Sequence, residues 1–174
     1  MPNRRYRRAP LALPAVLLAL AAAAPPAAQA AARAGTPADQ VLALINQARA
    51  QYGRPALVVS AALGRSAAAH SRTMASGCGL SHQCAGEAGL GARETSAGAR
   101  WTSAGENIGE GGPEPGTTAA IAQIAAGLTR DMLNEKPPGD GHRRNILSSG
   151  FGHIGIAVYR DGAGTVWMTQ DFSS

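Results

Sequence analysis

The spacing of apolar residues changes near residue 147 of this 174-residue chain, and that change limits the fold more than any other feature. Upstream, apolar side chains recur every three or four residues, which is the period of an amphipathic helix. Downstream, Ile154, Ile156 and Val158 occupy every second position, which is the period of a strand with one buried face. Helices that precede strands, rather than alternate with them, indicate an α+β layer fold.

Three segments combine the helical period with start or stop signals. The first, at about 37–52, follows the N-cap residue Thr36. The second, at about 60–77, starts at a serine and ends at a glycine, and the third, at about 118–134, stops before two prolines. We therefore expect three helices.

The strand period predicts a β-hairpin over residues 153–172, with its turn at 161–164. Between the second and third helices the chain is rich in Gly, Ser and Ala. Such a composition favours an ordered loop, and we expect residues 105–108 to form a short turn or a helix start within it.

The N-terminus has the layout of a secretory signal. Four arginines precede a short apolar run at 11–24, and Ala28-Gln29-Ala30 offers small residues for cleavage. The run is shorter than the about 20 residues of a membrane span, and Pro14 interrupts it. We therefore expect residues 1–30 to be removed and residues 31–37 to form a linker. The mature protein is expected to be secreted or periplasmic, with no membrane span.

The charge of the remaining chain gives no sign of a nucleic-acid partner. The sequence has 16 Lys and Arg against 11 Asp and Glu, but four arginines lie in the first 30 residues, which leaves 12 basic residues against 11 acidic ones. This balance lacks the basic stripe typical of nucleic-acid binding. The length suits one domain, which we place at residues 38–173, and we expect a monomer.

Two cysteines, Cys78 and Cys84, lie close together in the mature part. In an exported protein such a pair favours a disulfide, which would enclose His82 in a small ring. A zinc site formed by these three residues is the weaker alternative, since no second cysteine pair completes four ligands. The spacing of His70 places it on the apolar face of the second helix, so we interpret it as a packed core residue. His153 is expected at the surface.

Four motifs occur in one order along the chain: Ser81-His82, Gly105-Glu106-Asn107-Ile108, residues 141–147 (GHRRNIL) and residues 167–172 (WMTQDF). Together they resemble the bacterial branch of the CAP superfamily of cysteine-rich secretory, antigen 5 and pathogenesis-related 1 proteins, also called SCP-like, over roughly residues 38 to 173. The resemblance implies a three-layer α-β-α sandwich with a cleft lined by two histidines and two acids. Matched one by one, these are His82, Glu106, Glu135 and His142.

Two imidazoles and two carboxylates in one cleft allow three kinds of chemistry. They can hold zinc or another divalent metal, with His82 and His142 as ligands and Glu106 as a further donor. They can act as a general acid and base. They can also form a polar network that only holds loops in place. Asn107 and Asn145 follow site residues in their motifs, and we expect them to support those turns by bonding the turn backbone.

Two function classes therefore remain. The first is a module that binds an extracellular small molecule or lipid, with or without a metal. The second is a metal-assisted hydrolase of peptide or cell-wall material, with His82 and His142 as ligands and Glu106 as base. The chain has neither Gly-x-Ser-x-Gly nor His-Glu-x-x-His, and its cysteines are expected to be paired, so the binding module is favoured over the enzyme.

Overall fold

The computed structural model describes residues 35–174. The predicted signal peptide 1–30 and most of the predicted linker 31–37 lie outside these residues. The helical elements are α2 (Pro37–Gln51), α3 (Ala61–Thr73), the π-helical turn η1 (Met74–Cys78), α4 (Leu90–Ser96), α5 (Thr118–Asn134) and α6 (Gly141–Leu147). The strands are β1 (Val58–Val59), β2 (Ala104–Gly111), β3 (His153–Arg160) and β4 (Val166–Ser173).

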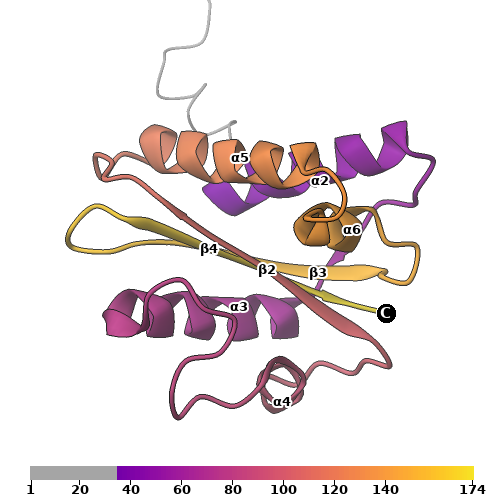
Figure 1. Ribbon diagram of the computed structural model, residues 1–174, viewed down its shortest axis with the longest axis horizontal. Coiled ribbons are helices and arrows are strands. Elements are labelled where there is room, and N and C mark those ends of the chain that lie inside the picture. Colours follow the sequence, from indigo (N-terminus) through magenta and orange to yellow (C-terminus); the bar gives the residue numbers. More distant parts are fainter. Residues whose placement is uncertain (1–34) are drawn as a thin grey trace, which may run out of the picture.

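The strands form one sheet with the order β1-β3-β4-β2. Strands β3 and β4 are the predicted hairpin, β2 runs antiparallel to β4, and the short β1 runs parallel to β3. Helices α2, α5 and α6 cover one face of the sheet, and α3 and α4 lie on the other (Figure 1). The expected α+β fold with three layers, α-β-α, is confirmed.

The main core lies between the sheet and the α2, α5 and α6 layer. Its buried members come from both helices and strands and include Ile45, Ile146, Ile154, Met168 and Phe172. The predicted start of α2 is also present. The Thr36 side chain accepts a hydrogen bond from the Asp39 amide, and the Asp39 carboxylate accepts one from the Thr36 amide. The apolar residues that set these periods therefore pack the helices onto the sheet, and the cap fixes where α2 begins.

Strand β2 corrects the expectation of a turn or helix start at residues 105–108. Its glycines hide the strand in the sequence, because they carry no apolar side chain to show a period of two. Packing explains two of them: a Cβ at Gly105 would lie 2.8 Å from the Phe151 ring, and one at Gly111 would lie 3.0 Å from Ile124. The strand therefore forms because it pairs with β4, and its glycines leave room for the side chains that pack against it.

Two short helices also differ from the sequence expectation. The turn that Asn145 was expected to support is part of helix α6, and α4 lies in the region expected to be a loop. The buried guanidinium of Arg49 donates hydrogen bonds to the carbonyl oxygens of Pro55, Ile146, Ser148 and Phe151. These bonds tie the end of α6 to the end of α2, so a long-range contact fixes the helix that carries His142.

Within residues 35–174, no helix is long and apolar enough to cross a membrane.

Candidate functional site

All four residues that the family resemblance assigned line one open pocket, with a volume of about 500 Å³. The pocket lies where the loop after η1, strand β2 and the segment from the end of α5 to α6 meet. Its lining is His82, Glu106, Glu135, Pro138, Gly139, Gly141, His142, Arg144 and Asn145. Polar side chains and glycines dominate this lining, and Pro138 is its one apolar side chain.

The first histidine–carboxylate pair joins His82 to Glu106. Nδ1 of His82 lies 2.9 Å from Oε1 of Glu106. The histidine side chain is 58% exposed, whereas the glutamate side chain is 3% exposed. Arg93 of α4 forms an ion pair with the other oxygen of Glu106 and donates to the His82 carbonyl at 3.1 Å. Arg93 therefore holds the buried Glu106 carboxylate in place, while His82 on its other oxygen is exposed to solvent.

The second pair joins His142 to Glu135. Nδ1 of His142 lies 2.5 Å from Oε1 of Glu135, and the other carboxylate oxygen accepts from the backbone amides of His142 and Arg143. Burial would raise the pKa of Glu135, but the bonds from His142 and from the two amides outweigh it and lower the pKa. Glu135 thus stays ionised and fixes the start of α6.

Both imidazoles are consequently held through Nδ1. Within residues 35–174, the Nε2 atom of neither His82 nor His142 makes a hydrogen bond. A carboxylate that accepts the Nδ1 proton fixes the tautomer and leaves the Nε2 lone pair for a metal, and zinc-binding histidines are commonly held in this way. The donor set therefore fits zinc or a similar divalent ion, with the two imidazoles as ligands and the carboxylates behind them.

Asn107 and Asn145 connect the two halves of the pocket across elements, not within their own turns as expected. Asn107 donates to the His142 carbonyl at 3.2 Å and to the side chain of Gln170. Asn145 donates to the Glu106 carbonyl at 3.1 Å and to the Asn107 side chain at 2.9 Å. Strand β2 and helix α6 are therefore joined next to both histidines.

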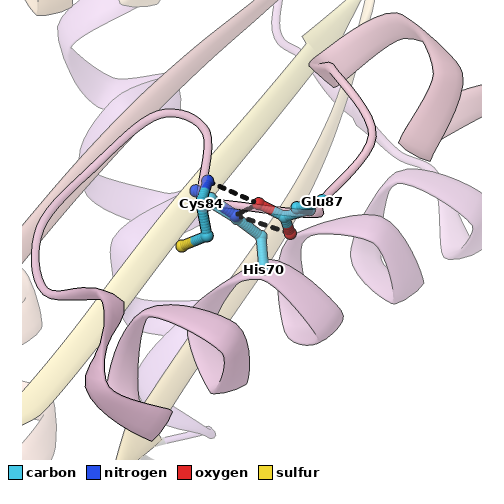
Figure 2. A group of neighbouring side chains, drawn as sticks. All are labelled: His70, Cys84 and Glu87. Atoms are coloured by element: carbon cyan, nitrogen blue, oxygen red, sulfur yellow. Dashed lines mark hydrogen bonds and ion pairs between the residues drawn. The ribbon is translucent and has the colours of Figure 1, made fainter.

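Behind the pocket lies a second polar group that the sequence reading did not assign to the site (Figure 2). His70 is fully buried, as predicted, but it is not surrounded only by apolar side chains: its Nδ1 lies 2.9 and 3.0 Å from the two oxygens of Glu87. Glu87 also accepts from the Cys84 amide and from Arg93. Burial would raise the pKa of Glu87, but these partners outweigh it and lower the pKa.

Helical spacing could place His70 on the inner face of α3, but it could not show that a loop residue, Glu87, meets it there. The expected disulfide between Cys78 and Cys84 is present. In the part of the chain that the structure describes, His70, Cys84 and Glu87 are the only His, Cys, Asp or Glu group of three whose ligand atoms all lie within 4.8 Å of one another. Among the four pocket residues, no three have ligand atoms that all lie within 4.8 Å of one another.

Two more buried acids missed by the sequence reading adjoin Glu106. Burial raises the pKa of Glu94 to about 7, and the Glu106 carboxylate adds to the rise. Burial likewise raises the pKa of Asp171, which stands opposite Glu106 in the sheet register, to about 8. Strand alternation could have placed Asp171 on the same face as Thr169, but it gave no sign that this face is buried. For Glu94 no signal was available, because α4 was not predicted.

Comparisons with known proteins show a family and a fold. A family model described as "Cysteine-rich secretory protein family", CAP, matches residues 42–172. A search among curated proteins finds no match. Among solved structures, the chain is similar to an extracellular protein containing a SCP domain from Bacillus anthracis, with 26% identity and a TM-score of 0.62. The match covers 79% of this chain but 40% of that one, so the chain spans about two fifths of the length of the Bacillus protein.

Two more distant structures share the fold alone. An outer surface protein from Borrelia burgdorferi has 12% identity and a TM-score of 0.65, and the match covers 78% of this chain and 90% of that one. The protein NaASP2, solved with Zn2+, has 10% identity and a TM-score of 0.58, with 79% of this chain and 80% of that one covered.

Proposed function

The chain belongs to the cysteine-rich secretory protein (CAP) family, and from that premise we propose that its pocket reversibly binds a divalent cation, zinc before others. The ligands would be the Nε2 atoms of His82 and His142. We further propose that the pocket, with its metal, binds a small polar extracellular molecule. The protein would act as a monomer outside the cytoplasm, in keeping with its disulfide, which an oxidising compartment favours.

One observation carries this proposal: two histidines line the same open pocket, and each is bonded through Nδ1 to its own carboxylate. Both Nε2 atoms are left without a hydrogen-bond partner within residues 35–174. The exposures of the two side chains, 58% for His82 and 33% for His142, let an ion reach them from solvent. A zinc ion was found with NaASP2, a protein of this fold, which makes zinc the metal to test first.

The carboxylates support this binding role better than catalysis. Glu106 has one oxygen on His82 and the other on Arg93, so both oxygens already accept from protein side chains, which favours an orienting role over that of a base toward a water molecule. The hydrolase alternative needs Glu106 as that base. Glu135 is likewise occupied by its histidine and by two backbone amides. Both acids therefore orient imidazoles.

The lining favours a polar ligand over a lipid. A metal bound by two histidines would keep open coordination positions for water or for an oxygen of the ligand. Arg144 and Asn145 stand on the same wall as His142 and can bind polar groups of a ligand beside the metal. A lipid tail would meet Pro138 as its only apolar partner in the pocket, so burial of its apolar surface would gain little.

Calorimetric zinc titration of the oxidised protein tests the proposal. We expect His82→Ala and His142→Ala each to weaken zinc binding by at least about tenfold, because each removes one of two protein ligands. The matched control is His153→Ala, since His153 is exposed and bonds only the terminal carbonyl of Ser174 among the described residues. Imidazole must be neutral to bind a metal, so the affinity should fall as the pH is lowered below about 6.

Absence of zinc binding by the unmodified protein at neutral pH would refute the metal site. An equal loss from His153→Ala would show that the binding is adventitious. Circular dichroism of each variant verifies that the fold is retained.

A further inference from the structure

The group formed by His70, Cys84 and Glu87 gathers beside helix α3 (Figure 2), and Nε2 of His70 lies 3.8 Å from Oε2 of Glu106. Its side chains are buried: His70 is 0% exposed, Cys84 is 4% exposed, and the Glu87 side chain is 12% exposed. Cys78 belongs to the same place, because its sulfur is bonded to that of Cys84. Three potential metal donors therefore meet here, and the exposed Cys78 is joined to them through the disulfide.

We propose that reduction of the Cys78–Cys84 disulfide creates a second metal site, specific for zinc and similar thiophilic ions, with Cys78, Cys84, His70 and Glu87 as its four ligands. In the oxidised protein the sulfurs are neutral and already bonded to each other, so they are poor ligands, whereas a thiolate is a strong one. A dithiol reductant would supply two electrons and become a disulfide itself, leaving two protein thiols. Zinc then displaces both thiol protons.

The geometry requires only small movements. The ligand atoms of His70, Cys84 and Glu87 already lie within 4.8 Å of one another. In a tetrahedral zinc site with bonds of about 2.0 to 2.3 Å, ligand atoms are about 3.3 to 3.8 Å apart. Contraction by roughly 1 Å would bring the three together around an ion. Separation of the two sulfurs after reduction lets Cys78 complete the set, and Gly77 and Gly79, both with positive φ, flank it.

The charges and hydrogen bonds around the group also suit a metal. Zinc with two thiolates and one carboxylate would carry a net charge of −1, and Arg93, whose Nη1 lies 3.2 Å from Glu87, would compensate it. If Nδ1 of His70 binds the ion, the proton must sit on Nε2. That nitrogen is buried, makes no hydrogen bond within residues 35–174, and lies 3.8 Å from Oε2 of Glu106. Ligating histidines commonly donate their second N–H to a carboxylate in this manner.

This arrangement would link the redox state to the pocket. The disulfide closes the ring that contains His82, and its reduction releases that loop. Zinc held by the same two cysteines would fasten the loop again. It would also turn His70 into a donor toward Glu106, the partner of His82.

Cobalt(II) spectroscopy on the full protein tests the site separately from the pocket. We use His142→Ala as background, because it weakens the proposed pocket site and leaves the second site untouched. With reduced protein we expect sulfur-to-cobalt charge-transfer absorption and the intense visible bands of a tetrahedral ion. Oxidised protein, and the double variant Cys78→Ser with Cys84→Ser, should show neither. His70→Gln and Glu87→Gln should each weaken cobalt and zinc binding by at least about tenfold.

X-ray absorption of the reduced protein with one equivalent of zinc gives a test that does not depend on the folding of variants at the ligands. Two sulfur and two nitrogen or oxygen neighbours are the expected result. A shell without sulfur, or one with a single sulfur, would overturn the proposal. Affinities unchanged by both His70→Gln and Glu87→Gln would do the same, since solvent would then complete the coordination. Because the pocket offers no sulfur, failure here leaves the proposed pocket function standing.

Discussion

At the scale of single residues, Glu135 shows how one carboxylate can set both the position and the electronic state of a histidine. It accepts from the His142 ring and from the His142 and Arg143 amides, which begin α6. Its lowered pKa keeps it ionised, and an ionised partner makes the imidazole a better donor to a metal.

We therefore predict that Glu135→Gln keeps the fold but lowers zinc affinity by about 10- to 100-fold, the usual cost of losing a carboxylate that accepts from a metal-binding histidine. Calorimetric titration measures the loss. The control is Glu110→Gln, an exposed glutamate on β2, which should bind as the unmodified protein does. Equal affinity for Glu135→Gln and the control would mean that the carboxylate only caps α6 and does not tune His142.

At the scale of elements, α3 lies unusually close to β3. An added Cβ at Gly155 would come within 2.1 Å of the Leu63 carbonyl carbon and 2.2 Å of the Gly64 nitrogen. Both are backbone atoms, which cannot turn aside as a flexible side chain can. With α3 this close to the sheet, Nε2 of His70 lies 3.8 Å from Oε2 of Glu106 on β2.

We predict that Gly155→Ala lowers the free energy of unfolding by about 3 kcal/mol or more, because the helix must move away from the sheet. Urea denaturation measures the change. Gly64→Ala is a matched control at the same contact, since a Cβ there meets no atom within 4 Å, and alanine in a helix is favoured over glycine by up to about 1 kcal/mol. If Gly155→Ala proved as stable as Gly64→Ala, α3 could move away from β3 without cost, and the prediction would be wrong.

At the scale of the whole molecule, the buried acids make stability depend on pH. The pKa values of Glu94 and Asp171 are raised to about 7 and about 8 in the folded protein. The unfolded chain would release these protons near pH 4, whereas the folded protein retains them. Their contribution to stability is therefore fully present below about pH 4 and is lost as the pH rises through about 8.

We predict that the free energy of unfolding falls by on the order of a few kcal/mol between pH 5 and pH 9, because each unit of pKa shift corresponds to about 1.4 kcal/mol. Asp171→Asn and Glu94→Gln, which cannot ionise, should each flatten this dependence. Urea denaturation at the two pH values measures it. Glu87 and Glu135 have lowered pKa values and act in the opposite direction at acidic pH, so the window above pH 5 isolates the raised pair. Equal slopes for both variants and the unmodified protein would contradict the prediction.

Several features of this protein could be determined from the sequence alone because neighbouring residues encode them. The period of three to four residues and the caps Thr36 and Ser60 identify α2 and α3, and the alternation after residue 152 identifies the β3–β4 hairpin. The short spacing of Cys78 and Cys84 pointed to their disulfide. The ordered motifs indicated the family and contain His82, Glu106 and His142, while the resemblance assigned Glu135, and all four residues line one pocket.

Tertiary structure alone decided the rest. Strand β2 forms by pairing with β4. Its glycines allow close packing, but they remove the alternation of apolar residues by which a strand is recognised. His70, Glu87 and Arg93 come from a helix, a loop and a second helix, and they meet only because the loop and α4 pack against α3. The raised pKa values of Glu94 and Asp171 likewise arise from burial. Local sequence reports periods, caps and motifs, whereas contact between distant segments and exclusion of water exist only once the layers have packed.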